Sequence, residues 1–230
     1  MLVEDWMTTG AILIRADDSV DRAIRLQRDH SVRMIPVVDE GKLVGVVTDK
    51  DLVQASLPSG IALNREEADD ITSNIKIRKV MTGSPITIMP DHTMDEATEI
   101  ILKSKIHGAP VIDEDKKIVG VLTLSDVLRF LMSMTGEDKI GYQFSFSLPD
   151  ESGYIAKIID LVKEYNGRIW TISCSYSGVP QGFRNVFMRI YDVAPKDIPD
   201  LTDKIKQKVK LRYFVDFKQD SRTIFDKQKS

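Results

Sequence analysis

The first 134 residues show one arrangement of apolar and polar positions twice. Each time, a segment with the apolar spacing of a helix precedes two short runs rich in valine and isoleucine, which are typical of strands. The runs read IPVVD and LVGVVT in the first copy, and APVID and IVGVLT in the second. Charged turns, EGK and EDKK, join the two runs of each copy. The pattern predicts a unit of a short strand, a helix, two strands and a second helix, written twice.

Residue-by-residue alignment supports this repeat. Pro36 falls on Pro110 at an offset of 74, and the Met-Thr pair at 7–8 falls on the pair at 81–82 at the same offset. One added residue in the second turn then makes the offset 75. The motif Gly-Φ-Φ-Thr-x-x-Asp is therefore repeated in register, as Gly45, Thr48 and Asp51 and again as Gly120, Thr123 and Asp126.

The helices of the repeat begin at recognisable caps. Residues 17–19, Asp-Asp-Ser, precede the apolar positions of the first helix and can cap it. Thr93-x-x-Glu96 has the spacing of a capping box, in which the two side chains bond each other's backbone amides. Two such small units could not bury their apolar faces separately, so we expect them to pack together.

A third segment follows a polar boundary at residues 135–140. Phe144, Phe146 and Leu148 alternate with polar residues, which predicts a half-buried strand. A helix ending at Asn166-Gly167, two strands, a second helix and a last strand follow. In the second helix lysines recur at every second place, but the apolar residues recur every three or four places and favour a helix, as seen at Ile198, Leu201, Ile205 and Val209. The order βαββαβ predicts a ferredoxin-like arrangement.

Composition narrows the function classes. The chain has 230 residues, 42% hydrophobic and 29% charged, and its net charge of −3 gives no reason to expect nucleic acid or an anionic membrane as a partner. No apolar run has the length of a membrane span, and the N-terminus lacks the basic segment of a signal peptide. Cys174 is the one cysteine, so no intramolecular disulfide can form and we expect a cytoplasmic protein. Its strand pattern predicts a core position for Cys174.

Catalysis finds little support in the chain. His30, His92 and His107 are isolated and show no metal-ligand spacing, so we expect neither a catalytic residue nor a metal site. Gly-rich phosphate loops and nucleophile elbows are missing from the sequence. We therefore expect a protein that is not an enzyme.

Taken together, Met-Thr, Pro-Val-Val/Ile-Asp and Gly-Φ-Φ-Thr-x-x-Asp resemble a tandem pair of CBS domains over residues 1–133. The resemblance implies an α+β fold in which two βαββα repeats form a pseudo-two-fold pair. It also implies binding of an adenine nucleotide in the cleft between the copies. AMP, ADP, ATP and S-adenosylmethionine all stay open as the ligand.

The repeated Thr-x-x-Asp has two interpretations. In the first it is only a capping box at the start of a helix and needs no ligand. The resemblance assigns it a second role, in which the hydroxyl and first-turn amides meet a phosphate and the carboxylate accepts the two ribose hydroxyls. The residues with these roles are Thr48, Asp51, Thr123 and Asp126.

Residues before each proline extend the expected nucleotide site. By the same resemblance, Arg33 and His107, three places before the prolines, lie near phosphate; alternatively they only end their helices, where cations suit the helix dipole. Ile35 and Ala109 are expected against the adenine. Gly108 and Ala109 leave more room than their counterparts, so we expect the second copy to hold the better site.

The third segment resembles an ACT domain, a regulatory module that usually binds amino acids, over residues 139–218. The resemblance rests on the order of elements and on the turn SLPDESGYIAKI, with its Asp150-x-x-Gly153 mark. It implies an effector site at Asp150, Gly153 and Tyr154. Glu151-Ser152 departs from the basic residue and proline usual in this turn, so an ACT-like domain without a ligand is the alternative. Gly153 is needed either because a ligand or a neighbouring chain approaches it, or because the turn's backbone requires glycine.

The expected layout is a first CBS domain at 1–56, a linker with a helical insert at 57–78, a second CBS domain at 79–134, the ACT-like domain at 139–218 and a fraying tail at 219–230. The insert resembles that of bacterial acetoin-utilisation AcuB-type proteins. Two functions follow as hypotheses. The chain is either a sensor that binds an adenine nucleotide, with or without an amino acid as a second effector, for an unknown regulated protein, or a ligand-free dimerisation module that serves as the regulatory subunit of an enzyme or transporter. A homodimer is expected in both cases, since pairing would cover exposed sheet edges.

Overall fold

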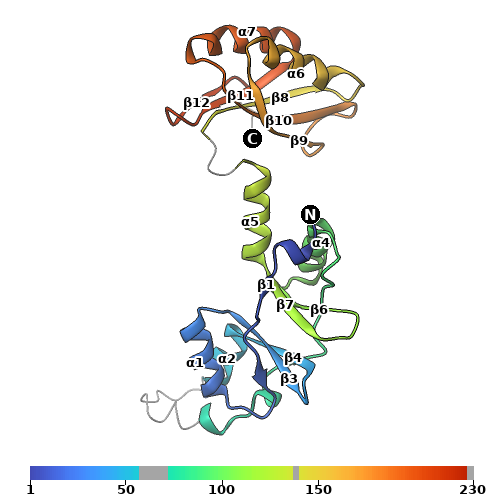
Figure 1. The fold of residues 1–230 in the computed structure, drawn as a ribbon, viewed down its shortest axis with the longest axis vertical. Coiled ribbons are helices and arrows are strands. Elements are labelled where there is room, and N and C mark those ends of the chain that lie inside the picture. Colours follow the sequence, from blue (N-terminus) through green and yellow to red (C-terminus); the bar gives the residue numbers. More distant parts are fainter. Residues whose placement is uncertain (57–71, 137–139, 227–230) are drawn as a thin grey trace. The chain divides into compact units, whose positions relative to one another are not determined.

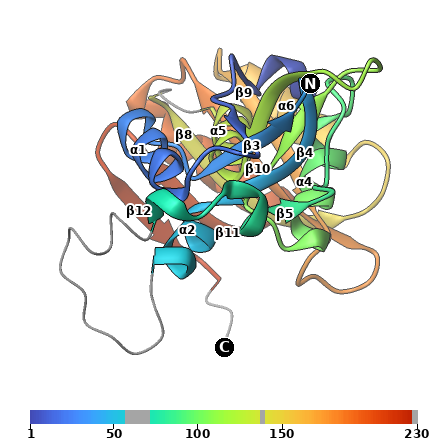
Figure 2. The same ribbon diagram turned by 90° about the horizontal axis from the view of Figure 1, so that it is seen from below.

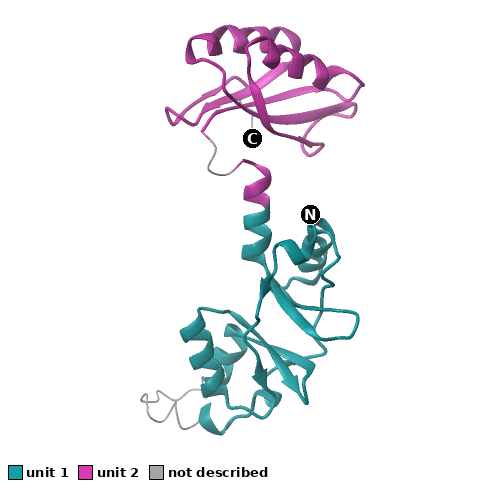
Figure 3. Ribbon diagram, viewed as in Figure 1, with its two compact units in different colours: residues 1–130 teal, residues 131–230 magenta. Residues whose placement is uncertain are grey.

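The computed structural model describes residues 1–56, 72–136 and 140–226. It divides into two compact units, residues 1–130 and 131–230, which are described separately (Figure 3). Of the linker with a helical insert expected at 57–78, residues 57–71 lie outside the described residues, and residues 72–74 are helical.

The N-terminal unit contains the two copies, each with the predicted order of elements (Figure 1). The first copy consists of a 3-10 turn Val3–Asp5, β1 Thr8–Thr9, β2 Ile14–Arg15, α1 Val20–His30, β3 Met34–Asp39, β4 Lys42–Thr48 and α2 Asp49–Ser56. The second consists of a 3-10 turn Ile77–Lys79, β5 Thr82–Gly83, α4 Met94–Ser104, β6 Gly108–Ile112, β7 Ile118–Thr123 and α5 Leu124–Met134.

The predicted caps begin both first helices. Ser19 accepts a hydrogen bond from the amide of Arg22 at the start of α1. Thr93 and Glu96 form the reciprocal capping box at the start of α4. Hydrogen bonds from Thr93, first from its amide and then from its hydroxyl, hold the pKa of Glu96 below its ordinary value. These caps confirm the helix starts predicted from the sequence.

The two copies exchange strands. In the four-stranded sheet, ordered β2-β3-β4-β5, the second copy's β5 pairs with the first copy's β4. The three-stranded sheet has the order β1-β7-β6, and here the first copy's β1 pairs with the second copy's β7. Each sheet thus contains strands from both copies, and neither sheet is complete without the other copy.

This exchange explains the glycine of the repeated motif. A Cβ atom on Gly120 would lie 2.8 Å from Met7 Sδ and 2.8 Å from the carbonyl oxygen of Thr8. At Gly45 the matching distances are 2.7 and 2.9 Å, to the same two atoms of the second copy's Met-Thr segment. Glycine is needed where the strand of the other copy crosses.

Each copy has a core beneath its helices, and the other copy contributes to it: Ile77 lies in the core of the first copy and Val3 in that of the second. Helices α1 and α2 lie side by side in both views of the ribbon (Figure 1 and Figure 2). The two cores use corresponding positions: Ile14, Ala23, Ile35 and Val37 in the first copy, and Ile88, Ala97, Ala109 and Val111 in the second.

In the C-terminal unit, one sheet is covered on one face by two helices (Figure 1). Its elements are β8 Tyr142–Pro149, α6 Tyr154–Glu164, β9 Arg168–Ser175, β10 Phe183–Tyr191, a 3-10 turn Pro195–Asp197, α7 Ile198–Lys208, β11 Lys210–Asp216 and β12 Ser221–Ile224. The strands are antiparallel in the order β12-β11-β8-β10-β9. Phe144, Phe146 and Leu148 of β8 are fully buried in one core with residues of α6 and α7, as the alternation predicted. The strand is more buried than the expected half, because Ser145 on its polar side is also fully buried.

Two expectations for this unit were wrong. Cys174 is exposed, because β9 lies at the edge of the sheet and not in its centre. The tail expected to fray includes β12, which pairs with β11 from Ser221 to Ile224. Sheet order decides both outcomes, and a local pattern does not contain it.

Across the described ranges, no helix combines the length and apolar character needed to cross a membrane. The same ranges contain no group of three or more His, Cys, Asp or Glu side chains placed to hold a metal ion.

Candidate functional site

Thr48 and Asp51 form a closed pair where β4 passes into α2. The amide and the hydroxyl of Thr48 both donate to Asp51 Oδ2, at 2.8 and 2.7 Å, and the amide of Asp51 donates back to Thr48 Oγ1 at 3.4 Å. The threonine hydroxyl hydrogen is therefore already used within the protein. The capping-box interpretation describes this geometry fully.

The second copy repeats the arrangement where β7 passes into α5. Thr123 donates to Asp126 Oδ2 from its amide at 2.7 Å and from its hydroxyl at 2.6 Å, and the amide of Asp126 lies 3.4 Å from Thr123 Oγ1. Asp126 is 2% exposed, whereas Asp51 is half-buried. The second oxygen of Asp126, Oδ1, pairs with Arg129.

The basic residues before the prolines lie beside these helix starts. The carbonyl oxygen of Arg33 accepts a hydrogen bond from the amide of Asp49 at 3.1 Å, and that of His107 accepts one from the amide of Leu124 at 2.8 Å. Both side chains are exposed. The structure thus brings each predicted basic residue next to the Thr-Asp pair of its own copy, and its role towards phosphate stays a prediction.

The residues expected against adenine lie deeper in the fold. Ile35 and Ala109 are fully buried in the two cores. Gly108 pairs with Thr123, and a Cβ atom there would lie 2.7 Å from the carbonyl oxygen of Leu122. Strand packing accounts for this glycine, so the roomier second site inferred from it stays a prediction.

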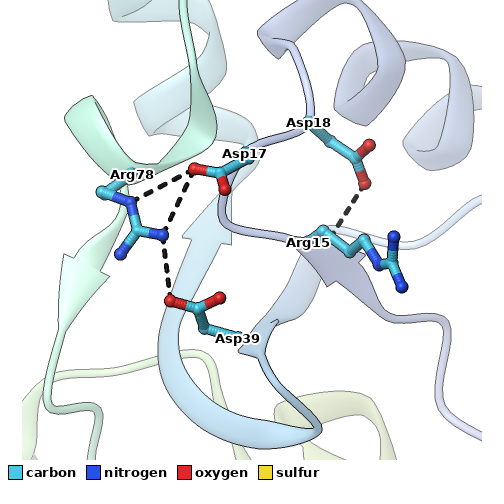
Figure 4. Close-up of polar contacts among 5 residues, drawn as sticks. All are labelled: Arg15, Asp17, Asp18, Asp39 and Arg78. Atoms are coloured by element: carbon cyan, nitrogen blue, oxygen red, sulfur yellow. Dashed lines mark hydrogen bonds and ion pairs between the residues drawn. The ribbon is translucent and has the colours of Figure 1, made fainter.

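An ion-pair cluster that sequence reasoning missed lies at the start of the second copy (Figure 4). Arg78 Nη2 lies 3.2 Å from Asp17 Oδ1 and 2.9 Å from Asp39 Oδ2, and these hydrogen bonds, the one to Asp39 first, raise the pKa of Arg78. Beside it, Asp18 accepts the amide of Arg15 at 2.9 Å. The cluster fastens the segment before β5 to the first copy across 61 residues of chain.

The cluster is not repeated in the second copy. The amide of Arg78 bonds the carbonyl oxygen of Ala16, and the amide of Glu4 bonds that of Pro90 in the corresponding place. An acidic residue thus replaces the arginine. The alignment places Glu4 opposite Arg78, which is the signal that could have revealed this difference.

The predicted effector residues of the C-terminal unit lie around one turn. Arg184 Nε lies 3.4 Å from Asp150 Oδ1, and the hydroxyl of Tyr176 lies 3.4 Å from the same oxygen. Gly153 has φ +87°, which favours glycine, and a Cβ atom there would meet no other atom within 4 Å. Tyr154 packs against the core, with Lys157 Nζ 4.8 Å from its ring centre.

Comparison with known proteins agrees with the fold of the N-terminal unit. Residues 3–58 and 77–133 match the CBS domain family. The uncharacterized protein YlbB of Bacillus subtilis is 33% identical over 127 residues, which cover 54% of this chain and 78% of YlbB. A crystal structure of CBSX2 in complex with AMP has a TM-score of 0.50 and 29% identity, and the match covers 58% of this chain and 97% of that chain. CBSX2 comes from Arabidopsis thaliana.

Enzymes also contain related segments. An inosine-5'-monophosphate dehydrogenase from Korarchaeum cryptofilum is 32% identical over 124 residues, which are 54% of this chain and 23% of the enzyme. The chain thus matches less than a quarter of that enzyme's length. The motifs, the exchanged strands and the family match confirm the tandem pair predicted from the sequence. The chain belongs to the proteins that carry a tandem pair of CBS domains.

Proposed function

We propose that this chain is a non-catalytic regulatory protein whose CBS pair binds an adenine nucleotide. The observation that carries the proposal is the doubled Thr-Asp pair, which stands at the start of a helix in both copies with the same hydrogen bonds. The AMP complex of CBSX2, a CBS-pair protein, supports an adenosine compound as the ligand class.

In this proposal the aspartates supply the ribose contact. Oδ2 of Asp51 is held by Thr48, so the carboxylate is fixed in direction before a ligand arrives. Its other oxygen is available to accept hydroxyl hydrogens, and a charged acceptor makes such hydrogen bonds strong. Arg33, exposed beside the same helix start, supplies positive charge for phosphate.

The C-terminal unit is proposed to be an ACT-like domain. Four of its strands run in the order β11-β8-β10-β9 with both helices on one face, which supports a ferredoxin-like arrangement. An amino acid is the proposed effector, near Asp150 and its neighbour Arg184, whose opposite charges suit an amino and a carboxyl group. The AcuB-type organisation of the whole chain and its cytoplasmic location belong to the same proposal.

A ligand-free scaffold is the second candidate, and exposed apolar side chains on α5 would supply its contact with a partner chain. Leu128 and Leu131 are each 53% exposed, and Leu124 lies on the same side one turn earlier. Contiguous apolar surface of this kind marks contacts with other proteins. We propose that it lies in a homodimer interface. The sensor and the scaffold both predict a dimer, so the oligomeric state does not separate them.

Thermal unfolding with AMP, ADP, ATP and S-adenosylmethionine separates the two candidates. A ligand present at 100 times its dissociation constant stabilises the folded state by about 2.7 kcal/mol, so the sensor predicts a higher melting temperature with at least one compound. The matched control is the double variant Asp51→Ala, Asp126→Ala, which should lose the shift while staying folded. A chain whose melting temperature responds to none of the compounds at millimolar concentration is a scaffold and not a nucleotide sensor.

A further inference from the structure

The two copies differ three residues after each aspartate of the repeated motif. Arg129 occupies this position in α5, and Gln54 occupies it in α2. Arg129 Nη2 pairs with Asp126 Oδ1, the oxygen that Thr123 leaves free. Within the described ranges of the chain, Oδ1 of Asp51 has no hydrogen-bond or ion-pair partner. Both oxygens of Asp126 are therefore engaged by protein groups, whereas Asp51 has one oxygen that the described part of the protein leaves without a partner.

The two aspartates also differ in how deeply they are buried. The side chain of Asp126 is 3% exposed, while that of Arg129 is 64% exposed, so the guanidinium lies on the solvent side of the carboxylate. Asp51 is only half-buried. Because a carboxylate accepts hydroxyl hydrogens only through accessible lone pairs, donors from solvent reach Asp51 directly. They reach Asp126 only after the arginine has moved away.

We propose that Arg129 is an internal competitor for the nucleotide's ribose hydroxyls at the second copy, so that the first copy holds the tighter site. This inference rests on the proposed nucleotide-binding function. It reverses the order of the two sites that we expected from the room left by Gly108 and Ala109. The physical reason is that binding at the second copy must first break a charge-assisted contact to a buried carboxylate, whereas binding at the first copy breaks none.

Titration calorimetry with AMP on single-site variants tests the proposal. Asp51→Ala leaves only the second site, and Asp126→Ala leaves only the first. The test exchanges the two residues: Arg129→Gln is added to Asp51→Ala, and Gln54→Arg is added to Asp126→Ala. An ion pair with one exposed partner is worth up to about 1 kcal/mol, which corresponds to about a fivefold change in dissociation constant. We expect Arg129→Gln to tighten AMP binding at the second site about fivefold and Gln54→Arg to weaken it at the first by a similar factor.

The outcomes separate this inference from the function on which it rests. If the wild-type chain binds none of AMP, ADP, ATP and S-adenosylmethionine, both are overturned; if it binds another of these and not AMP, that compound takes the place of AMP in the titrations. If the wild-type chain binds AMP but Arg129→Gln leaves binding unchanged or weakens it, the competitor role alone is wrong; weaker binding would mean that Arg129 contacts the nucleotide itself. The Gln54→Arg arm removes no native contact of the aspartate, so it gives an answer even if Asp51→Ala unfolds the first copy.

Discussion

Replacing Gly120 with alanine tests the strand exchange that joins the two copies. The new methyl group would lie 2.8 Å from Met7 Sδ and 2.8 Å from the carbonyl oxygen of Thr8, about 0.6 Å closer than the 3.4 Å at which ordinary contact begins. The methionine side chain can move, but the carbonyl belongs to β1, whose residues Thr8 and Thr9 pair with Val121 and Gly120. Relief of the clash must therefore displace the backbone of the other copy.

The expected loss follows from two opposing terms. Overpacking of a well-packed site costs about 1–3 kcal/mol. Replacing glycine also removes freedom from the unfolded chain, which returns about 0.4–1 kcal/mol. The net prediction for Gly120→Ala is a loss of about 1–2 kcal/mol in the free energy of unfolding of the N-terminal unit. Gly45→Ala should cost a similar amount, since its contacts are nearly the same.

Urea unfolding monitored by tryptophan fluorescence measures this loss. Trp6 adjoins Met7, and the centre of its ring lies 5.6 Å from that of Phe130. Its emission therefore reports the unfolding of the N-terminal unit. A Trp170→Phe background removes the one other tryptophan. Gly83→Ala is the matched control, because a Cβ atom at position 83 would lie 4.0 Å from the carbonyl oxygen of Val44, which is an ordinary contact distance. Equal stability of the Gly120→Ala and Gly83→Ala variants would refute the crossing of strands at this glycine.

Three further variants test local features. Hydrogen bonds from Thr93 lower the pKa of Glu96 below its usual 4.5. The contribution of the Glu96 carboxylate to the stability of the folded state is therefore complete above that pH and is lost as the pH falls through the lower pKa of the folded protein. The melting temperature of the wild type should therefore decline more steeply below pH 4.5 than that of Glu96→Gln, and parallel curves would contradict this. Gly153→Ala should cost about 1–2 kcal/mol from its positive φ alone, and Gly153→Asn less; an alanine variant as stable as wild type in urea would show that the turn tolerates side chains. Arg78→Ala should lower the melting temperature of the N-terminal unit, and by less at 1 M salt because its ion pairs with Asp17 and Asp39 are exposed; a difference that salt leaves unchanged would point to packing instead.

Local patterns in the sequence determined much of this protein. The repeat, its offset and the predicted helices and strands follow from apolar spacing, because a period of two or of 3.6 places one face of an element against a core. The caps at Ser19 and Thr93 could be named in advance, since a cap needs only residues within one turn. The lysine-rich segment around Ile198 was recognised as a helix for the same reason.

Only the tertiary structure decided in which sheet each strand lies and with which strand it pairs. The pairing of β1 with β7 joins residues more than a hundred positions apart, and nothing in the local pattern of either segment specifies it. The glycine of the repeated motif has its physical reason in that crossing. The contact of Arg78 with Asp17 and Asp39 likewise depends on bringing distant segments together.

Some features of the candidate site were likewise predictable from the sequence, and others depend on the tertiary structure. The sequence determined that Thr48 and Asp51, and their counterparts in the second copy, stand at helix starts. The ion pair between Arg129 and Asp126 depends on the rotamer of the arginine and on the burial of the aspartate, and both are properties of the packed molecule. Exposure of Cys174 depends on the order of strands in a sheet, where an edge strand and a central strand have the same alternation. Periodicity records which side of an element is apolar, and only packing decides what covers it.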